Sequence, residues 1–278
     1  MNISRRHALH TLSLGALALS SCASMSKKPP IFDAHCHIID HRFPVVENQG
    51  YVPEHFPLDQ YLSQTQPLGV RSGAIVSGSF HGFDQTYLKA TLKALGPQWV
   101  GVTQVPMNIS DQEIVELTQS GVRALRFNIF RGRIEDVKEI VSLAKRAHDI
   151  GKWHAEIYAD AFALAPHVNA LSSCPQIVID HLGMSQKGIP VVLDLVRAGA
   201  KVKATGFGRL EMDIPAALES ISKINEHALV FGTDIPSTRA KRPFLASDID
   251  LIRSVLGDQL SQNVLWNNAR ALYRLQSA

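Results

Sequence analysis

Two histidines separated by one residue, His35 and His37, stand at the end of the first strongly apolar run of the sequence. Residues two apart on a β-strand point to the same face, so both imidazoles would face the same space. A third histidine, His181, and an aspartate, Asp234, stand at the ends of two later apolar runs. These four groups could bind one divalent ion such as zinc, because imidazole and carboxylate are among its usual ligands. Without a metal, Asp234 could act as a general base while the histidines donate hydrogen bonds to a polarised carbonyl group.

These side chains can meet only if the runs that carry them lie side by side. Eight short apolar runs recur along the sequence, separated by longer segments that mostly show helical spacing. The runs cover residues 31–35, 73–77, 99–105, 122–127, 153–158, 177–181, 202–205 and 229–232. The expected helices cover residues 88–95, 111–119, 135–150, 161–171, 189–198 and 214–226, and two closing helices span 248–275.

The alternation of strand and helix predicts an α/β fold, specifically a (β/α)8 TIM barrel. The strand runs are mostly continuous rather than alternating, as expected for parallel strands covered by helices. An open doubly wound sheet is the alternative, but no Gly-x-Gly-x-x-Gly motif follows the first run to favour it. In a barrel the carboxyl ends of the strands share one face, which carries the active site. The four groups above stand at such ends, so the barrel mouth is the predicted site.

Five motifs in order resemble the amidohydrolase superfamily, specifically its branch of 2-pyrone-4,6-dicarboxylate lactonases and sugar lactonases. They lie at residues 32–37, 79–84, 121–128, 179–183 and 231–236, and the resemblance extends from residue 31 to residue 273. It implies hydrolysis of a lactone. No lysine ends the fourth run, so the carbamate-bridged binuclear metal site of other superfamily members is not expected.

The resemblance also implies roles for the four groups at the strand ends. Asp234 would take a proton from the attacking water, and His35, His37 and His181 would stabilise the oxyanion that develops on the carbonyl oxygen. A metal ion is not required in this branch. One divalent ion, for example zinc, is nevertheless possible on His35, His37, His181 and Asp234.

Related dicarboxylate enzymes hold their substrate with arginines, a serine and tyrosines. The arginine positions match Arg126, then Arg131 or Arg133, then Arg209, and a planar guanidinium can bind a carboxylate with two hydrogen bonds. The remaining polar positions match Ser79, Tyr158 and Tyr51. Met184 stands where the dicarboxylate lactonase has an arginine. A lactone with one carboxylate, or a sugar lactone, is therefore at least as well matched as the dicarboxylate.

Other titratable residues near the strand ends have structural alternatives. Glu156 could be a catalytic acid, or it could pair with Arg126 or another internal cation. Asp33 would share the face of the histidines and orient one of them, or close the barrel bottom. His81 could line the site or cap a local turn. The basic loop at residues 237–243 could be solvated or attract an anionic substrate.

The N-terminal residues have the layout of an export signal, with Arg5 and Arg6 directly before a short apolar run. We expect residues 1–21 to be a signal peptide of the twin-arginine type, 22–30 a tether, and 31–278 the barrel domain. The segment before Cys22 resembles a lipobox, so Cys22 would carry lipid and anchor an exported, periplasmic lipoprotein. An ordinary secretory signal is the alternative.

Composition limits the possible functions of the chain. A hydrophobic fraction of 45% excludes intrinsic disorder, and a net charge of +3 disfavours binding to nucleic acid through phosphate neutralisation. Three hypotheses remain: a lactonase acting on a small anionic lactone, a metal-dependent decarboxylase or amide hydrolase of the same superfamily, and a lipoprotein that only binds a small anion. The sequence does not indicate an oligomeric state.

Overall fold

Eight parallel strands form one sheet whose spatial order, β1 to β8, is their order in the chain. The computed structural model describes residues 28–130 and 136–275. The strands are β1 (Ile31–Cys36), β2 (Val70–Val76), β3 (Trp99–Thr103), β4 (Val122–Asn128), β5 (His154–Tyr158), β6 (Ile177–Ile179), β7 (Lys201–Ala204) and β8 (Leu229–Phe231). Each overlaps one predicted run, which confirms the predicted α/β (β/α)8 barrel.

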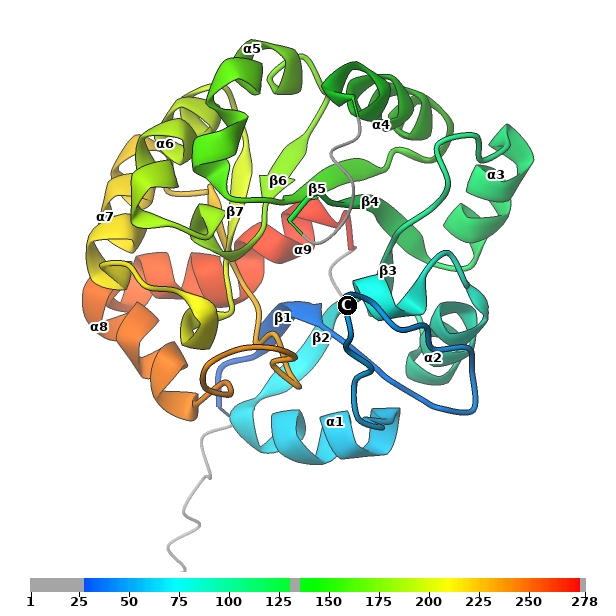
Figure 1. The fold of residues 1–278 in the computed structure, drawn as a ribbon. Coiled ribbons are helices and arrows are strands. Elements are labelled where there is room, and N and C mark those ends of the chain that lie inside the picture. Colours follow the sequence, from blue (N-terminus) through cyan, green and yellow to red (C-terminus); the bar gives the residue numbers. More distant parts are fainter. Residues whose placement is uncertain (1–27, 131–135, 276–278) are drawn as a thin grey trace, which may run out of the picture.

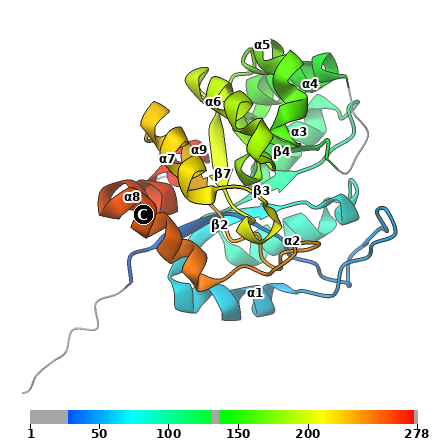
Figure 2. The same ribbon diagram turned by 60° about the vertical axis from the view of Figure 1, so that its left-hand side comes forward.

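Helices surround the strands, with α1 and α5 on opposite sides in both views (Figure 1 and Figure 2). They are α1 (Leu58–Thr65), α2 (Thr86–Leu95), α3 (Asp111–Gln119), α4 (Val137–Gly151), α5 (Val168–Leu171), α6 (Ile189–Arg197), α7 (Ile214–Ile224), α8 (Ala246–Gln262) and α9 (Asn268–Leu272). The prediction missed α1. No helix in the described ranges is long and apolar enough to cross a bilayer.

Helix α3 shows how local sequence fixes the boundaries of an element. The Ser110 side chain accepts a hydrogen bond from the Glu113 backbone N–H at 3.2 Å, and the Glu113 carboxylate accepts one from the Ser110 backbone N–H at 2.9 Å. This capping box satisfies two N–H groups that a helix start leaves unpaired. After the helix, Gly121 takes a left-handed φ of 100°, which a glycine adopts without steric cost. The chain can therefore turn directly into β4.

The barrel is nearly closed where β8 meets β1. The Asp234 backbone N–H donates to the His35 carbonyl oxygen at 2.7 Å, and the His37 N–H donates to the Ile235 carbonyl oxygen at 2.8 Å. A Cβ on Gly232 would lie 2.6 Å from the His35 backbone nitrogen, so this approach requires a glycine. These contacts bring the predicted base and two predicted histidines to one edge.

Two apolar layers lie on either side of the strands. Inside the barrel, Phe32 stacks on Tyr273 with ring centroids 5.4 Å apart, and Val178 and Val230 belong to the same cluster. The outer layer packs the strands against the helices and includes Cys36. Tyr273 directly follows α9, so this helix closes the end of the barrel opposite the mouth.

Some predicted features lie outside the described residues. These are the signal peptide, the lipidation site Cys22, all of the tether but its last three residues, and both Arg131 and Arg133.

Candidate active site

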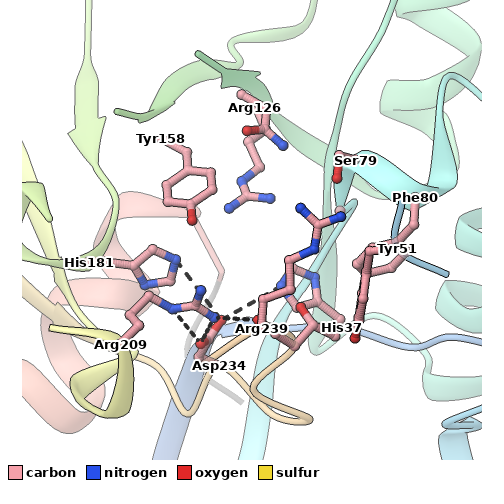
Figure 3. A pocket seen from close by; sticks show the side chains of 13 residues that line it. His37, Tyr51, Ser79, Phe80, Arg126, Tyr158, His181, Arg209, Asp234 and Arg239 are labelled. Carbon is pink, nitrogen blue, oxygen red and sulfur yellow. Dashed lines mark hydrogen bonds and ion pairs between the residues drawn. The ribbon is translucent and has the colours of Figure 1, made fainter. Parts of the chain in front are cut away.

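A pocket opens at the carboxyl ends of the strands, where the predicted site residues meet (Figure 3). The predicted residues that line it are His37, Tyr51, Ser79, Arg126, Tyr158, His181, Arg209 and Asp234. Its other lining residues are Gly78, Phe80, Asn128, Thr238 and Arg239. His35 is fully buried and lies against Asp234, just beneath this lining.

Asp234 lies at the centre of the site. Its Oδ1 faces the Nε2 atoms of His35 and His37, both at 3.7 Å, and that of His181 at 4.0 Å. Its Oδ2 accepts hydrogen bonds from Nε and Nη2 of Arg209, the first at 3.0 Å. Burial alone would raise the pKa of Asp234, but the Arg209 guanidinium and the imidazoles outweigh it and hold that pKa far below its ordinary value. The carboxylate is therefore ionised in the free protein.

The second nitrogen of each imidazole has its own partner. Nδ1 of His37 donates to the Val76 carbonyl oxygen at 2.7 Å, because a carbonyl can only accept. Nδ1 of His181 lies 2.6 Å from Oγ1 of Thr205, which can donate or accept. Burial lowers the pKa of His181 to about 3 and that of His35 well below 6.5. Both of these rings are therefore neutral at physiological pH.

The backbone around His181 and Asp234 departs from the usual conformation. Their φ angles are 50° and 60°, in the left-handed region that non-glycine residues rarely adopt. Gly206 also has a positive φ, and a Cβ there would lie 2.7 Å from Nδ1 of His181 and 2.8 Å from Nε of Arg209. Such strained positions are common at functional sites. Here they place an imidazole and a guanidinium against the same carboxylate.

Among the described residues, three arginines line the pocket, and Asp234 is the one acidic residue beside them. Arg126 donates to Oδ2 of Asp180 at 3.0 Å and to the Ser77 carbonyl oxygen at 3.1 Å. Arg239, from the predicted basic loop, lies over the Tyr51 ring at 4.4 Å. The lining thus has an excess of positive groups, which suits an anionic ligand.

Tyr158 contributes a polar atom to the pocket. Its ring packs edge-on against His181 with centroids 5.2 Å apart, and the Arg126 guanidinium lies 4.8 Å from its centroid. Its hydroxyl is buried and finds no hydrogen-bond partner in the described part of the chain. It points into the pocket in Figure 3. The hydroxyl is therefore available to a bound ligand.

A buried charged layer beneath the pocket includes residues that the sequence prediction missed. Lys203 is fully buried and donates to Oε2 of Glu156 and to Nδ1 of His35. Its Nζ also lies 3.6 Å from Oδ1 of Asp180. Lys203, rather than Arg126, is therefore the cation that pairs with Glu156, whereas Arg126 pairs with Asp180.

The orientation predicted for Asp33 is wrong, because the β1–β2 register shifts between Asp33 and Cys36. The shift turns His35 inward and leaves Asp33 outside. The Asp33 carboxylate instead accepts hydrogen bonds from the hydroxyls of Tyr61 at 2.8 Å and Thr233 at 2.6 Å. It therefore joins β1 to α1 and to the end of β8.

His81 holds its local turn. Its Nδ1 accepts from the Gly78 backbone N–H at 3.0 Å, and its Nε2 then donates to the Ile38 carbonyl oxygen at 3.0 Å. It is not among the residues that line the pocket. The structure therefore supports the prediction that His81 caps a local turn, rather than the alternative that it lines the site.

Three donor groups of the site lie close enough together to bind one metal ion. His35, His181 and Asp234 each place one ligand atom within 4.8 Å of the others, whereas His37 lies outside this group of described residues. Nε2 of His35 and Oδ1 of Asp234 are buried and have no hydrogen-bond partner within residues 28–130 and 136–275. This spacing suits one divalent ion. The contact between Lys203 and His35 does not, because a histidine ligand ordinarily donates its other N–H to an acceptor. The side chains therefore fit a site without metal better than a metal centre.

Comparison with known proteins places this site in a family. The sequence matches the amidohydrolase family model over residues 32–275, a range that includes His35, His181 and Asp234. The chain belongs to the amidohydrolase family. The resemblance expected from the five motifs is thereby confirmed for the family.

Relatives of this amidohydrolase include two curated enzymes. A 2-pyrone-4,6-dicarboxylate hydrolase of Comamonas testosteroni is 30% identical over 156 residues, 54% of this chain and 51% of the relative. This alignment spans about half the length of that protein. A 4-sulfomuconolactone hydrolase of Rhizobium radiobacter is 24% identical over 242 residues, 80% of this chain and 81% of the relative.

Solved structures have the same fold. The crystal structure of a putative 2-pyrone-4,6-dicarboxylic acid hydrolase from Pseudomonas putida has a TM-score of 0.79 and 26% identity. The similarity covers 90% of this chain and 99% of that protein.

Proposed function

We propose that this amidohydrolase hydrolyses a lactone that bears a carboxylate. The observation that carries the proposal is the placement of Asp234, whose Oδ1 faces three imidazoles in a pocket lined by three arginines. The two curated relatives support it, since both are named as hydrolases and one name specifies a lactone. A carboxylate on the substrate would match the excess of guanidinium groups.

Substrate binding follows from the groups that line the pocket. The substrate carboxylate engages Arg209 and Arg126, and the Tyr158 hydroxyl donates to a further oxygen. A carboxylate that binds Arg209 competes with Asp234 for the same guanidinium. This competition weakens the interaction that lowers the pKa of Asp234, so the bound substrate makes Asp234 a stronger base.

The hydrolysis step uses Asp234 and the imidazoles in different roles. Oδ1 of Asp234 takes a proton from water as the water oxygen attacks the lactone carbonyl carbon. His37 lies beside the same water, since its Nε2 is 3.7 Å from Oδ1 of Asp234 and its Nδ1 is held by the Val76 carbonyl oxygen. Imidazole N–H groups of His35 and His181 stabilise the oxyanion. When the ring C–O bond breaks, the protonated Asp234 returns its proton to the leaving oxygen, and the product is a ring-opened acid.

The residue at position 184 bears on how many carboxylates the substrate carries. Its backbone N–H donates to the His181 carbonyl oxygen at 2.9 Å, and its side chain does not line the pocket. Position 184 therefore supplies no guanidinium to the described part of the pocket, unlike the arginine that the dicarboxylate lactonases carry there. We therefore favour a substrate with one carboxylate over one with two.

We also propose that the protein is exported and anchored through a lipid on Cys22. The support is the sequence pattern of Arg5, Arg6 and the apolar run before Cys22. Replacing Cys22 by alanine should move the protein from the membrane fraction to the soluble fraction. Retention of the C22A variant in the membrane would overturn the anchor.

A lactone panel tests the proposed activity. Lactones of one ring size carrying zero, one or two carboxylates are incubated with the purified protein, and ring opening is followed by proton release. We expect the highest kcat/KM for the lactone with one carboxylate. If none of these lactones opens faster than in buffer, the proposed function is wrong.

A further inference from the structure

Lys203 lies beneath the active-site pocket and contacts one of its histidines. It projects from β7 into the barrel, and its side chain has no exposed surface. Its ammonium group lies 3.2 Å from Nδ1 of His35 and 3.6 Å from Oδ1 of Asp180, and it donates a short hydrogen bond to Glu156. A fully buried lysine is rare unless it is paired, because burial of its charge is costly, so the groups around the ammonium decide its position.

The position of the Lys203 ammonium is fixed by its neighbours. Oε1 of Glu156 accepts hydrogen bonds from the Tyr273 hydroxyl at 2.7 Å and from Nε2 of His154 at 3.0 Å. Asp180 is held in turn by Arg126. Because these partners hold both carboxylates in place, the ammonium that binds them also stays in place, against His35.

This contact determines which nitrogen of His35 carries the proton. An ammonium group only donates, so Nδ1 of His35 must accept and present its lone pair to Lys203. The neutral ring then carries its proton on Nε2, which faces Oδ1 of Asp234 at 3.7 Å. We propose that Lys203 is a positioning residue that holds His35 in the Nε2–H tautomer and so directs a hydrogen-bond donor into the site.

The two histidines of the His-x-His motif thereby acquire opposite tautomers. His37 donates from Nδ1 to the Val76 carbonyl oxygen, so the uncharged form of this ring has no proton on Nε2, whereas the uncharged form of His35 carries its proton on Nε2. In these uncharged forms, one strand supplies an acceptor for water and a donor for the oxyanion. This division of roles rests on the proposed hydrolase function, but the tautomers themselves do not.

Removal of Lys203 should change the tautomer, because Oδ1 of Asp180 lies 3.5 Å from Nδ1 of His35. Without the ammonium, this carboxylate oxygen becomes the nearest partner and favours a proton on Nδ1. Lys203→Met alone would leave Glu156 without its cation, which is destabilising. The test therefore uses Lys203→Met with Glu156→Gln, which removes both charges together.

The experiment is a long-range ¹H–¹⁵N NMR measurement on the purified full chain labelled at histidine nitrogens, at neutral pH and without substrate. The His35 signals are assigned as those lost in a His35→Gln variant. Lys201→Met is the matched control. Lys201 lies at the start of the same strand, and its ammonium donates to the His227 carbonyl oxygen rather than to His35. Thermal unfolding confirms that each variant is folded.

We expect the Nε2–H tautomer for His35 in the wild type and the control, and the Nδ1–H tautomer in the double variant. For a lactone that the wild type hydrolyses, kcat in the double variant should fall by about 10²-fold with KM little changed, as when one oxyanion donor is lost. An Nδ1–H tautomer in the wild type, or an unchanged tautomer in the folded double variant, would overturn the inference. Since the NMR measurement needs no turnover, the inference about the His35 tautomer would stand even if the proposed hydrolase function were wrong.

Discussion

Arg209 donates two hydrogen bonds to a single oxygen of Asp234, Oδ2, and leaves Oδ1 to the imidazoles. The aspartate is thus held in one orientation, with Oδ2 paired to a cation and the buried Oδ1 left without a hydrogen-bond partner in the described residues, facing the three imidazoles. The same arginine lines the pocket, so a substrate carboxylate can compete for it. Substrate recognition and base strength are therefore coupled through one guanidinium group.

Replacing Arg209 by glutamine should shift the pH dependence of hydrolysis. The guanidinium lowers the pKa of Asp234, so its loss raises that pKa. Asp234 acts as a base only when ionised, and the acid limb of the kcat/KM profile should move to higher pH. KM for a carboxylated lactone should also rise. Arg197→Gln, which changes a surface pair with Asp194, is the control, and identical acid limbs for R209Q and wild type would contradict the coupling.

Arg126 should matter for stability as well as binding, because it neutralises the buried Asp180. Arg126→Met should lower the free energy of unfolding by about 3 kcal/mol, because Oδ2 of the buried Asp180 loses its hydrogen-bond donor while Lys203 stays 3.6 Å from Oδ1. Arg123, on the same strand, bonds only the Thr118 and Val122 carbonyl oxygens in the described residues, and Arg123→Met should cost about 1 kcal/mol. Urea unfolding of both variants measures the difference. Equal losses would refute the structural role of the Arg126–Asp180 pair.

His81 should make the protein less stable in mild acid. Burial lowers its pKa to about 3 from the ordinary 6.5, so between these values the unfolded chain binds a proton that the folded chain does not. The contribution of the neutral His81 to the free energy of unfolding is fully present above pH 6.5. It falls as the pH drops below 6.5, by about 1.4 kcal/mol per pH unit. In urea unfolding at pH 6.5 and 5.5, the His81→Gln variant should lose about 1 kcal/mol less stability than the wild type, because the unfolded imidazole is already half protonated at pH 6.5. Equal losses in both proteins would show that His81 is charged in the fold.

Chelation should leave hydrolysis unchanged, because the side chains fit a site without metal better than a metal centre. The measurement is the rate of lactone opening after dialysis against a chelator, with and without added Zn²⁺. A rate that falls on chelation and returns with zinc would assign His35, His181 and Asp234 as metal ligands after all.

The strand order and the mouth residues were predictable because they depend on simple patterns. Apolar runs predicted the eight strands, and the polar residues at their ends predicted His181 and Asp234 in one pocket. The inward position of His35 and outward position of Asp33 depend on a register shift in β1, which residue type does not reveal. Helix α1 was missed although Leu58, Tyr61, Leu62 and Thr65 have helical spacing.

Lys203 left a signal in the sequence that the prediction did not use. It stands between Val202 and Ala204, both of which pack in the outer apolar layer. Strand alternation therefore turns the lysine into the barrel, where a cation needs an acidic partner. Glu156 lies on β5, two strands away from β7, and was predicted either to act as a catalytic acid or to pair with Arg126 or another internal cation. Which lysine or arginine pairs with Glu156 depends on the stagger of the strands, and this stagger is known only from the structure.

The activity of the Asp234→Asn variant tests most directly the claim that Asp234 is the general base. Asparagine preserves the size and a hydrogen-bond acceptor for Arg209 but cannot take a proton from water. With the best lactone of the panel, we predict that kcat falls by about 10²–10⁴-fold while thermal unfolding shows a folded protein. Turnover like that of the wild type in the folded D234N variant would contradict the assignment of Asp234 as the base.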